Sequence, residues 1–277
     1  MKLVGFLIAS FIIIVGILIS QFYVASKSPF FMVFCNVGQG DGIYMRAFSE
    51  DIVIDGGPDG SIVECLNRHM SLFDRNIELM VVTHADSDHY AGFLDVLDSY
   101  TVTHFATSHG DSDVLGYQAL LQKLEKLNVP IRRLEQGESI KVNEQLQLDI
   151  LWPPKAFTDV DDDRNNSSLV MLLDYQDFEA ILPGDVDKEY LNILLPDLNH
   201  IDIFKLSHHG SRTGTDEKTF ENFRPELSII SAGKDNRFDH PHKEVIEALK
   251  NADLQYKTTF EGDIVITSNG QGFNVVQ

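Results

Sequence analysis

Short apolar runs alternate with stretches of helical spacing along most of this chain. Runs bounded by Gly, Pro and Asn predict strands, at residues 31–37, 43–47, 51–55, 78–83, 102–106, 146–151, 169–174, 178–182, 201–206 and 227–231. Apolar positions three or four residues apart predict helices at 62–73, 115–127, 188–195, 217–223 and 245–252, another marked by Phe93, Val96 and Leu97, and a final hairpin of 263–267 with 272–276. The series predicts an α/β domain of two sheets flanked by helices.

The first 26 residues form a separate segment. Leu3–Ser26 has no charged residue, and as a helix it would span about 36 Å, enough to cross a hydrocarbon core of about 30 Å. The apolar run exceeds the length of a signal-peptide core, which favours an uncleaved anchor, although Val24-Ala25-Ser26 would also suit cleavage before Lys27. We therefore expect a membrane anchor or signal segment at 1–26 and one exported domain at 27–277.

Charge and cysteine content narrow the function further. The formal net charge is −20 and the isoelectric point is near 4.7, which counts against extended binding of duplex DNA but leaves chemistry at a single phosphodiester open. The two cysteines, Cys35 and Cys65, lie in a predicted strand and a predicted helix. We interpret them as buried thiols, with a disulfide as the alternative that the sequence leaves open.

The densest group of candidate metal ligands follows the predicted strand 78–83. Imidazoles and carboxylates crowd into six residues there, at His84, Asp86, Asp88 and His89. Such a group repels itself and loses hydration when it is buried, and a divalent cation offsets both costs. The sequence therefore predicts a metal site at the end of this strand.

Two later strands end in the same kinds of residue. Asp185 follows an apolar strand and a Pro-Gly turn, and His208 and His209 follow another strand. Alone, Asp185 would be interpreted as a helix cap. Six of the ten histidines lie in three short motifs, at 84 and 89, 208 and 209, and 240 and 242, and this concentration favours metal binding.

These motifs resemble those of metallo-β-lactamase-fold hydrolases, and in particular the soluble domain of ComEC-type DNA-uptake proteins. The matching segments, in the family's order, are Val37–Asp41, Asp55–Gly57, His84–His89, Asn166–Val170, Gly184-Asp185, Ser207–Ser211 and Gly233 through His242. The resemblance covers residues 30–277. It implies a four-layer αββα fold, preceded here by one transmembrane segment.

This sequence departs from the general metallo-β-lactamase pattern at three positions. Asp86 stands where the general fold has a second His, Asn165-Asn166 occupies the stretch of the usual third His, and Asn36 replaces an expected Asp. An oxygen-rich site suits Mn²⁺ as well as Zn²⁺. The long transport membrane domain of the competence proteins is not present in this sequence.

The resemblance assigns a role to each candidate residue. His84 and Asp86 would hold one divalent ion, Asp88 and His89 a second, Asp185 would bridge, and His208 would complete the set with His209 as the substitute. Asp88 and Lys205 are the catalytic candidates. Lys205 lies at a strand end, where it would neutralise a phosphate or an oxyanion. The candidates for substrate contact are His209, Ser211, Arg212 and His240.

Three functions remain open at this stage. The favoured one is hydrolysis of a phosphodiester by a DNase-like enzyme that uses one or two Zn or Mn ions. The second is hydrolysis of another ester or amide, including a β-lactam, although the missing histidines count against a tri-histidine zinc site. The third is a non-catalytic anchored binding module, because fold resemblance by itself does not establish activity.

Overall fold

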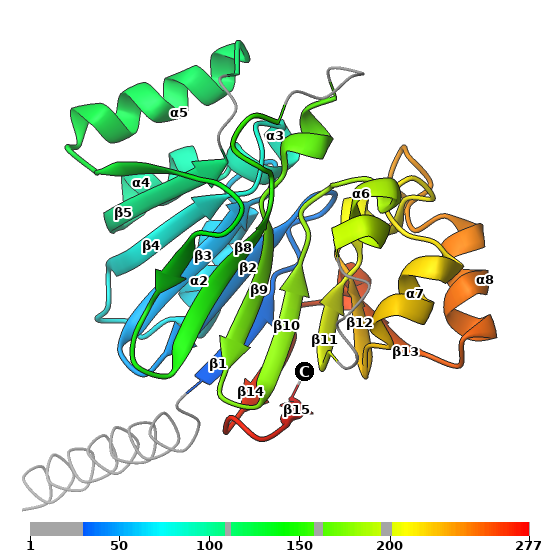
Figure 1. The fold of residues 1–277 in the computed structure, drawn as a ribbon. Helices are drawn as coiled ribbons and strands as arrows, with labels where there is room; N and C mark the ends of the chain where they lie inside the picture. Colours follow the sequence, from blue (N-terminus) through cyan, green and yellow to red (C-terminus); the bar gives the residue numbers. More distant parts are fainter. Residues whose placement is uncertain (1–29, 109–111, 158–162, 195–200, 277) are drawn as a thin grey trace, which may run out of the picture.

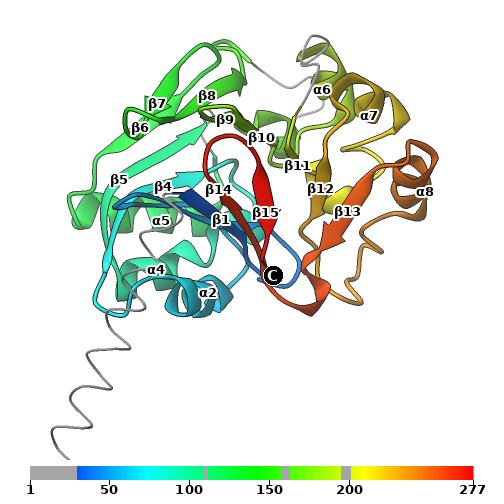
Figure 2. The same ribbon diagram turned by 90° about the horizontal axis from the view of Figure 1, so that it is seen from below.

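The computed structural model describes residues 30–108, 112–157, 163–194 and 201–276. Two sheets face each other with helices on their outer sides (Figure 1, Figure 2). The expected anchor at 1–26 lies outside the described residues. Within the described part of the chain, no helix is both long and apolar enough to cross a membrane.

The first sheet, sheet A, has eight strands in the order β15-β14-β1-β2-β3-β4-β5-β6. Their bounds are Phe30–Phe34 (β1), Gly42–Ala47 (β2), Glu50–Gly56 (β3), Asn76–Val82 (β4), Thr101–Ser108 (β5), Ile131–Leu134 (β6), Ile264–Ser268 (β14) and Phe273–Val275 (β15). Strands β3 to β6 are parallel, and the remaining neighbours are antiparallel. The predicted final hairpin is confirmed, and its first strand, β14, also pairs with β1, so the hairpin extends the sheet beyond β1.

The second sheet, sheet B, has seven strands in the order β13-β12-β11-β10-β9-β8-β7. Their bounds are Ser139–Lys141 (β7), Leu146–Trp152 (β8), Val170–Tyr175 (β9), Phe178–Leu182 (β10), Ile203–Lys205 (β11), Leu227–Ile230 (β12) and Gln255–Thr258 (β13). Strands β10 to β13 are parallel. In both sheets, the parallel strands therefore deliver their carboxyl ends to one edge, where α/β proteins place ligands.

Three apolar clusters separate the four layers. Alternate residues of the strands, such as Met32 and Leu148, meet between the two sheets. The opposite face of sheet A packs on α2 (Ser61–His69), α4 (Phe93–Ser99) and α5 (Leu115–Lys126). The opposite face of sheet B packs on α6 (Lys188–Leu194), α7 (Glu217–Phe223) and α8 (Lys243–Asn251). The expected αββα layering of the described residues is thus present.

Three strands were absent from the sequence prediction. β6, β7 and β13 lie at the edges of their sheets and consist of the polar segments IRRL, SIK and QYKT. Edge strands carry charged and polar side chains because one side faces solvent, so they lack the apolar pattern that identified the inner strands.

The interpretation of the two cysteines as free thiols was wrong. Cys35 and Cys65 form a disulfide that joins the end of β1 to α2. Both residues are fully buried, as expected. The bond fixes the start of the loop that carries Asp41.

Candidate metal centre

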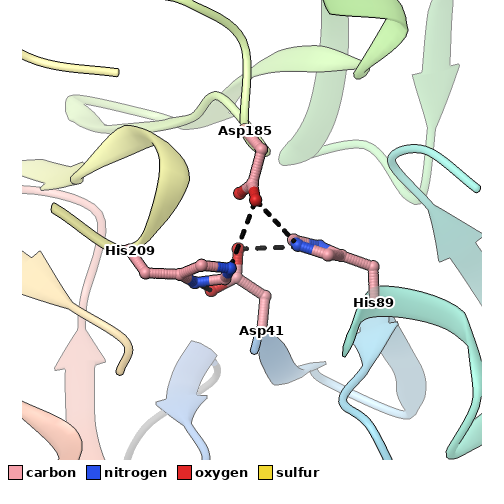
Figure 3. Close-up of side chains that lie close together, drawn as sticks. All are labelled: Asp41, His89, Asp185 and His209. Atoms are coloured by element: carbon pink, nitrogen blue, oxygen red, sulfur yellow. Dashed lines mark ion pairs between the residues drawn. The ribbon is translucent and has the colours of Figure 1, made fainter. Parts of the chain in front are cut away.

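Four loops at the carboxyl ends of strands bring acids and imidazoles to one point between the two sheets (Figure 3). Asp41 follows β1 and His89 follows β4, whereas Asp185 follows β10 and His209 follows β11. Oδ2 of Asp185 lies 3.2 Å from Nε2 of His89 and 3.2 Å from Nε2 of His209. One ligand atom from each of the four residues lies within 4.8 Å of the others. We call these four residues the buried cluster.

A close contact between backbones places Asp41 in the buried cluster. Its N–H donates to the carbonyl of Asp88 at 3.1 Å. Gly40 precedes it with φ of +138°, and a Cβ at this position would lie 2.3 Å from the same carbonyl oxygen. Only glycine allows this conformation together with this approach, so Gly40 is what lets the two loops meet.

Hydrogen bonds behind the two cluster histidines set their orientation. Nδ1–H of His89 donates to Oδ2 of Asp55 at 2.8 Å, and Asp55 in turn accepts from N and Oγ1 of Thr83, both at 2.8 Å. Nδ1–H of His209 donates to the carbonyl of Ser231 at 3.0 Å. Both rings therefore turn Nε2 toward Asp185. Partners of this kind fix metal-binding histidines in proteins.

The electrostatics of the buried cluster favour positive charge at its centre. Burial by itself would raise the pKa of Asp185, but attraction to His209 and His89 outweighs it and holds the pKa well below its usual range. Burial would lower the pKa of His89, yet the carboxylates of Asp185 and Asp55 raise it well above its usual value. Burial also opposes ionisation of Asp41, and the ammonium of Lys205 overcomes it and lowers this pKa.

The residues of the cluster fit a divalent cation. Five buried atoms that belong to the cluster or border it have no hydrogen-bond partner among the described residues: Oδ1 of Asp41, Nε2 of His84, Nε2 of His89, Oδ1 of Asp185 and Nε2 of His209. An unpaired buried polar atom is costly. Two imidazoles and two carboxylates are also a ligand set that Zn²⁺ and Mn²⁺ accept.

Other predicted ligands border the cluster. His84 is buried with its ring centroid 4.2 Å from that of His89, and desolvation lowers its pKa to about 4, so it is neutral at pH 7. Asp88 lies 3.5 Å from His209 and lines the cleft described below. His208 is partly exposed, with Nε2 4.0 Å from Asp185. Asp86 lines the same cleft, with Oδ2 3.9 Å from Nε2 of His84, and Oδ1 pairs with Arg164 at 2.7 Å.

Lys205 lies within the protein rather than on the wall of the cleft. It is 1% exposed, pairs with Asp41, donates to the carbonyl of Gly184 at 3.2 Å and lies 3.7 Å from Asp185. Burial would lower its pKa, but Asp41 and Asp185 raise it. The ammonium thus holds two cluster carboxylates in place. Its catalytic role at a substrate stays a prediction.

A cleft of about 840 Å³ opens over the cluster. Asp185 and His209 lie at its base, and its wall includes Asp88, Arg164 and His240. Arg164 begins the short 3-10 helix Arg164–Ser167, so this segment between β8 and β9 lies beside the site. Desolvation lowers the pKa of His240 to about 3.

Two of the predicted substrate contacts do not line the cleft. Ser211 is buried and hydrogen-bonds to Thr213, and Arg212 extends toward Glu244, 4.0 Å away. His209 belongs to the buried cluster at the base of the cleft and does not lie on the rim of the cleft. The roles of Ser211, Arg212 and His209 at a substrate stay predictions.

Solved structures of low sequence identity share this architecture. The metallo-β-lactamase-fold protein YhfI from Bacillus subtilis matches with a TM-score of 0.60 and 10% identity, over 86% of this chain and 100% of that one. CmlA, a diiron β-hydroxylase from Streptomyces venezuelae, gives 0.59 and 9% over 87% and 55%. A diphosphatase of the PhnP family gives 0.51 and 13% over 86% and 98%.

The chain has the metallo-β-lactamase fold. Its sequence is similar to ComE operon protein 3 of Bacillus subtilis, 29% identical over 191 residues, which is 67% of this chain and 24% of that protein. It is also similar to Recombination protein 2 of Haemophilus influenzae, 27% identical over 234 residues, which is 83% of this chain and 27% of that protein. The chain is thus related to ComEC-type proteins. It spans about a quarter of the length of these two relatives. No protein-family profile matches it.

Two residues of the metal centre, Asp41 and Asp55, were not predicted as site residues from the sequence. Asp41 was noted only as part of a motif, and Asp55 likewise, although one joins the cluster and the other orients His89. Asp55 lies at the end of the apolar strand β3, the same signal that identified Asp185. Asp41 lies at the far end of the loop after β1, directly before β2, so the end of an apolar strand does not mark it.

Proposed function

We propose that this chain is a metal-dependent hydrolase that cleaves a phosphodiester in nucleic acid. The observation that carries the proposal is the buried cluster, in which Nε2 of both imidazoles and Oδ1 of both carboxylates have no hydrogen-bond partner in the described structure. Asp41, His89, Asp185 and His209 would hold one divalent ion. His84, Asp88 and His208 each border the cluster and would bind a second ion. Such an ion activates water for attack on an ester.

The chain's own residues prepare the site in three ways. Asp55 and Ser231 hold the two cluster imidazoles so that Nε2 stays available. Lys205 offsets the repulsion between Asp41 and Asp185. Asp88 reaches the cleft, and although burial opposes its ionisation, the neighbouring imidazoles of His209 and His89 hold its pKa below the usual range. Its carboxylate is thus available to accept a proton from water.

Two observations support a phosphodiester as the substrate. The sequence relatives are ComEC-type proteins, and a PhnP-family diphosphatase shares the fold. The charge of the site limits how much nucleic acid it binds. The cleft wall carries the acids Asp59, Asp86 and Asp88, and these acids and the net charge of −20 argue against contact with a long stretch of duplex DNA. A short contact with a single strand is the form of binding that this charge allows.

We also propose that the domain is exported and stays tied to a membrane by residues 1–26. The disulfide between Cys35 and Cys65 supports export, because disulfides form and persist in oxidising compartments. The similarity to ComE operon protein 3 and Recombination protein 2 supports an association with a membrane.

The function is tested with the full chain in detergent, loaded with Mn²⁺ or Zn²⁺. The substrates are single-stranded DNA, bis-nitrophenyl phosphate and a chromogenic cephalosporin. We expect turnover of the two phosphodiesters. Cleavage of the cephalosporin alone would replace the proposal with the β-lactam alternative, and no turnover together with substoichiometric metal would favour a binding module.

A variant pair connects activity to the site. Asp88→Ala should reduce turnover of both phosphodiesters by at least about a hundredfold, because it removes a carboxylate from the cleft. It should leave the circular dichroism spectrum unchanged. Asp177→Ala, an exposed acid in the turn between β9 and β10, should keep full activity. Full activity in Asp88→Ala would show that the site is misassigned.

A further inference from the structure

Three large apolar side chains are exposed at the edge of sheet A opposite to the cleft. Phe48 is 49% exposed, Leu72 75% and Phe73 89%. Phe48 lies in the turn between β2 and β3, and the other two lie in the loop before β4. An ion pair between Arg46 and Asp74, 3.5 Å apart, joins these two segments. We call Phe48, Leu72 and Phe73 the apolar edge.

The chain enters the described domain at the same edge. Phe30, the first described residue, is the register partner of Ala47 across β1 and β2, which places it next to the Phe48 turn. β1 accordingly begins at the lower side of Figure 1. The uncharged apolar stretch 3–26 ends only four residues before Phe30, and four residues reach at most about 14 Å.

We propose that the apolar edge rests in the interface of a lipid bilayer, beside the point where the chain leaves it. Exposed aromatic and aliphatic side chains are unfavourable in water and favourable at the headgroup level. Exposed Arg75, in the same loop as Leu72 and Phe73, adds a cation of the kind found beside such anchors. The occupant is lipid because, with residues 3–26 in a membrane as proposed above, the tether is too short to carry this edge far from it.

This placement orients the metal centre. β4 starts at the apolar edge with Asn76 and ends at Val82, just before His84, and seven residues of strand extend about 23 Å. The cleft therefore opens on the side of the domain away from the bilayer, where a soluble polymer reaches it. This orientation of the domain rests on the membrane tether proposed above and does not depend on the reaction that the site performs.

The test uses the full chain reconstituted in phosphatidylcholine vesicles with and without brominated acyl chains. Phe73→Trp places a fluorophore in the apolar edge. Leu115→Trp is the matched control, because Leu115 is 81% exposed but begins α5 on the cleft side. Each signal is corrected with the parent chain, whose single tryptophan is Trp152.

We expect the brominated lipid to quench the Phe73→Trp signal by about half or more and to leave Leu115→Trp unchanged, because an interfacial side chain lies within about 10 Å of the acyl boundary. Equal quenching of both, or quenching of neither in chains that float with the vesicles, would overturn the proposal. Chains that fail to float with vesicles would overturn it as well, since the tether would then not be in lipid. Because no metal or substrate is present, a failed hydrolase assay leaves this result unaffected.

Discussion

Nδ1 of His89 lies 2.8 Å from Oδ2 of Asp55, and this buried pair connects the end of β3 to the buried cluster. Asp55 also accepts two hydrogen bonds from Thr83, so its carboxylate is fixed before any ion binds. The imidazole consequently presents Nε2 toward Asp185. The site thus depends on a residue that lies behind the ligands as well as on the ligands themselves.

Asp55→Asn should weaken metal binding by about 10- to 100-fold, because the amide no longer holds the His89 ring with a charged acceptor. Isothermal titration with Mn²⁺ or Zn²⁺ measures the dissociation constant. Asp59→Asn is the matched control, since Asp59 lines the same cleft but lies on an exposed loop. Equal affinity in the two variants would remove Asp55 from the account of the site.

Gly40→Ala should displace Asp41 from the cluster, because its Cβ would lie 2.3 Å from the Asp88 carbonyl oxygen. We expect a loss of stability of about 2 kcal/mol or more together with weaker metal binding. Gly38→Ala provides the comparison: Gly38 also has a positive φ, +80°, but nothing lies within 4 Å of its Cβ position. It should cost only about 1 kcal/mol of backbone strain and bind metal normally. The two are compared by urea unfolding and metal titration.

Removal of the disulfide in the double variant Cys35→Ala/Cys65→Ala should lower the free energy of unfolding by about 3 kcal/mol, because the bond closes a loop with a sequence separation of 30 residues. Denaturant unfolding measures the loss. A reducing agent should destabilise the parent chain by a similar amount and leave the variant unaffected. If the reductant changed neither protein, the two sulfurs would not be bonded in solution.

Asp263 should make stability depend on pH in the acid range. Burial opposes its ionisation, but hydrogen bonds from His69, the backbone of Asn36 and Arg68 lower its pKa to about 2, from 3.8. A depressed folded-state pKa contributes stability that is present above pH 3.8 and is lost as pH falls through 2. Asp263→Asn should therefore cost about 1–2 kcal/mol at pH 7.

The measurement compares free energies of unfolding of the parent chain and Asp263→Asn between pH 7 and pH 2.5. The difference between them should shrink toward the acid end. Asp177→Asn, an exposed acid in the β9–β10 turn, should show no such trend. A difference that stays constant with pH would mean that Asp263 acts through its shape rather than its charge.

The sequence by itself determined the layers and the approximate place of the site. Inner strands and helices were recognisable because their apolar period matches one buried face, and parallel strands bring their carboxyl ends to one edge. The motifs at 84–89, 185 and 208–209 therefore had to lie near one another in any such fold. Polar edge strands such as β6 carry no such pattern and were not identified.

Only the tertiary structure decided which atoms meet. His208 and His209 are adjacent and chemically identical, yet His209 alone joins the cluster, because both have positive φ in a tight turn and their side chains point in different directions. Asp41 enters through the backbone contact at Gly40, and Cys35 meets Cys65 because β1 packs against α2. Side-chain direction at a turn and contact between distant segments depend on three-dimensional packing, which spacing along the chain does not encode.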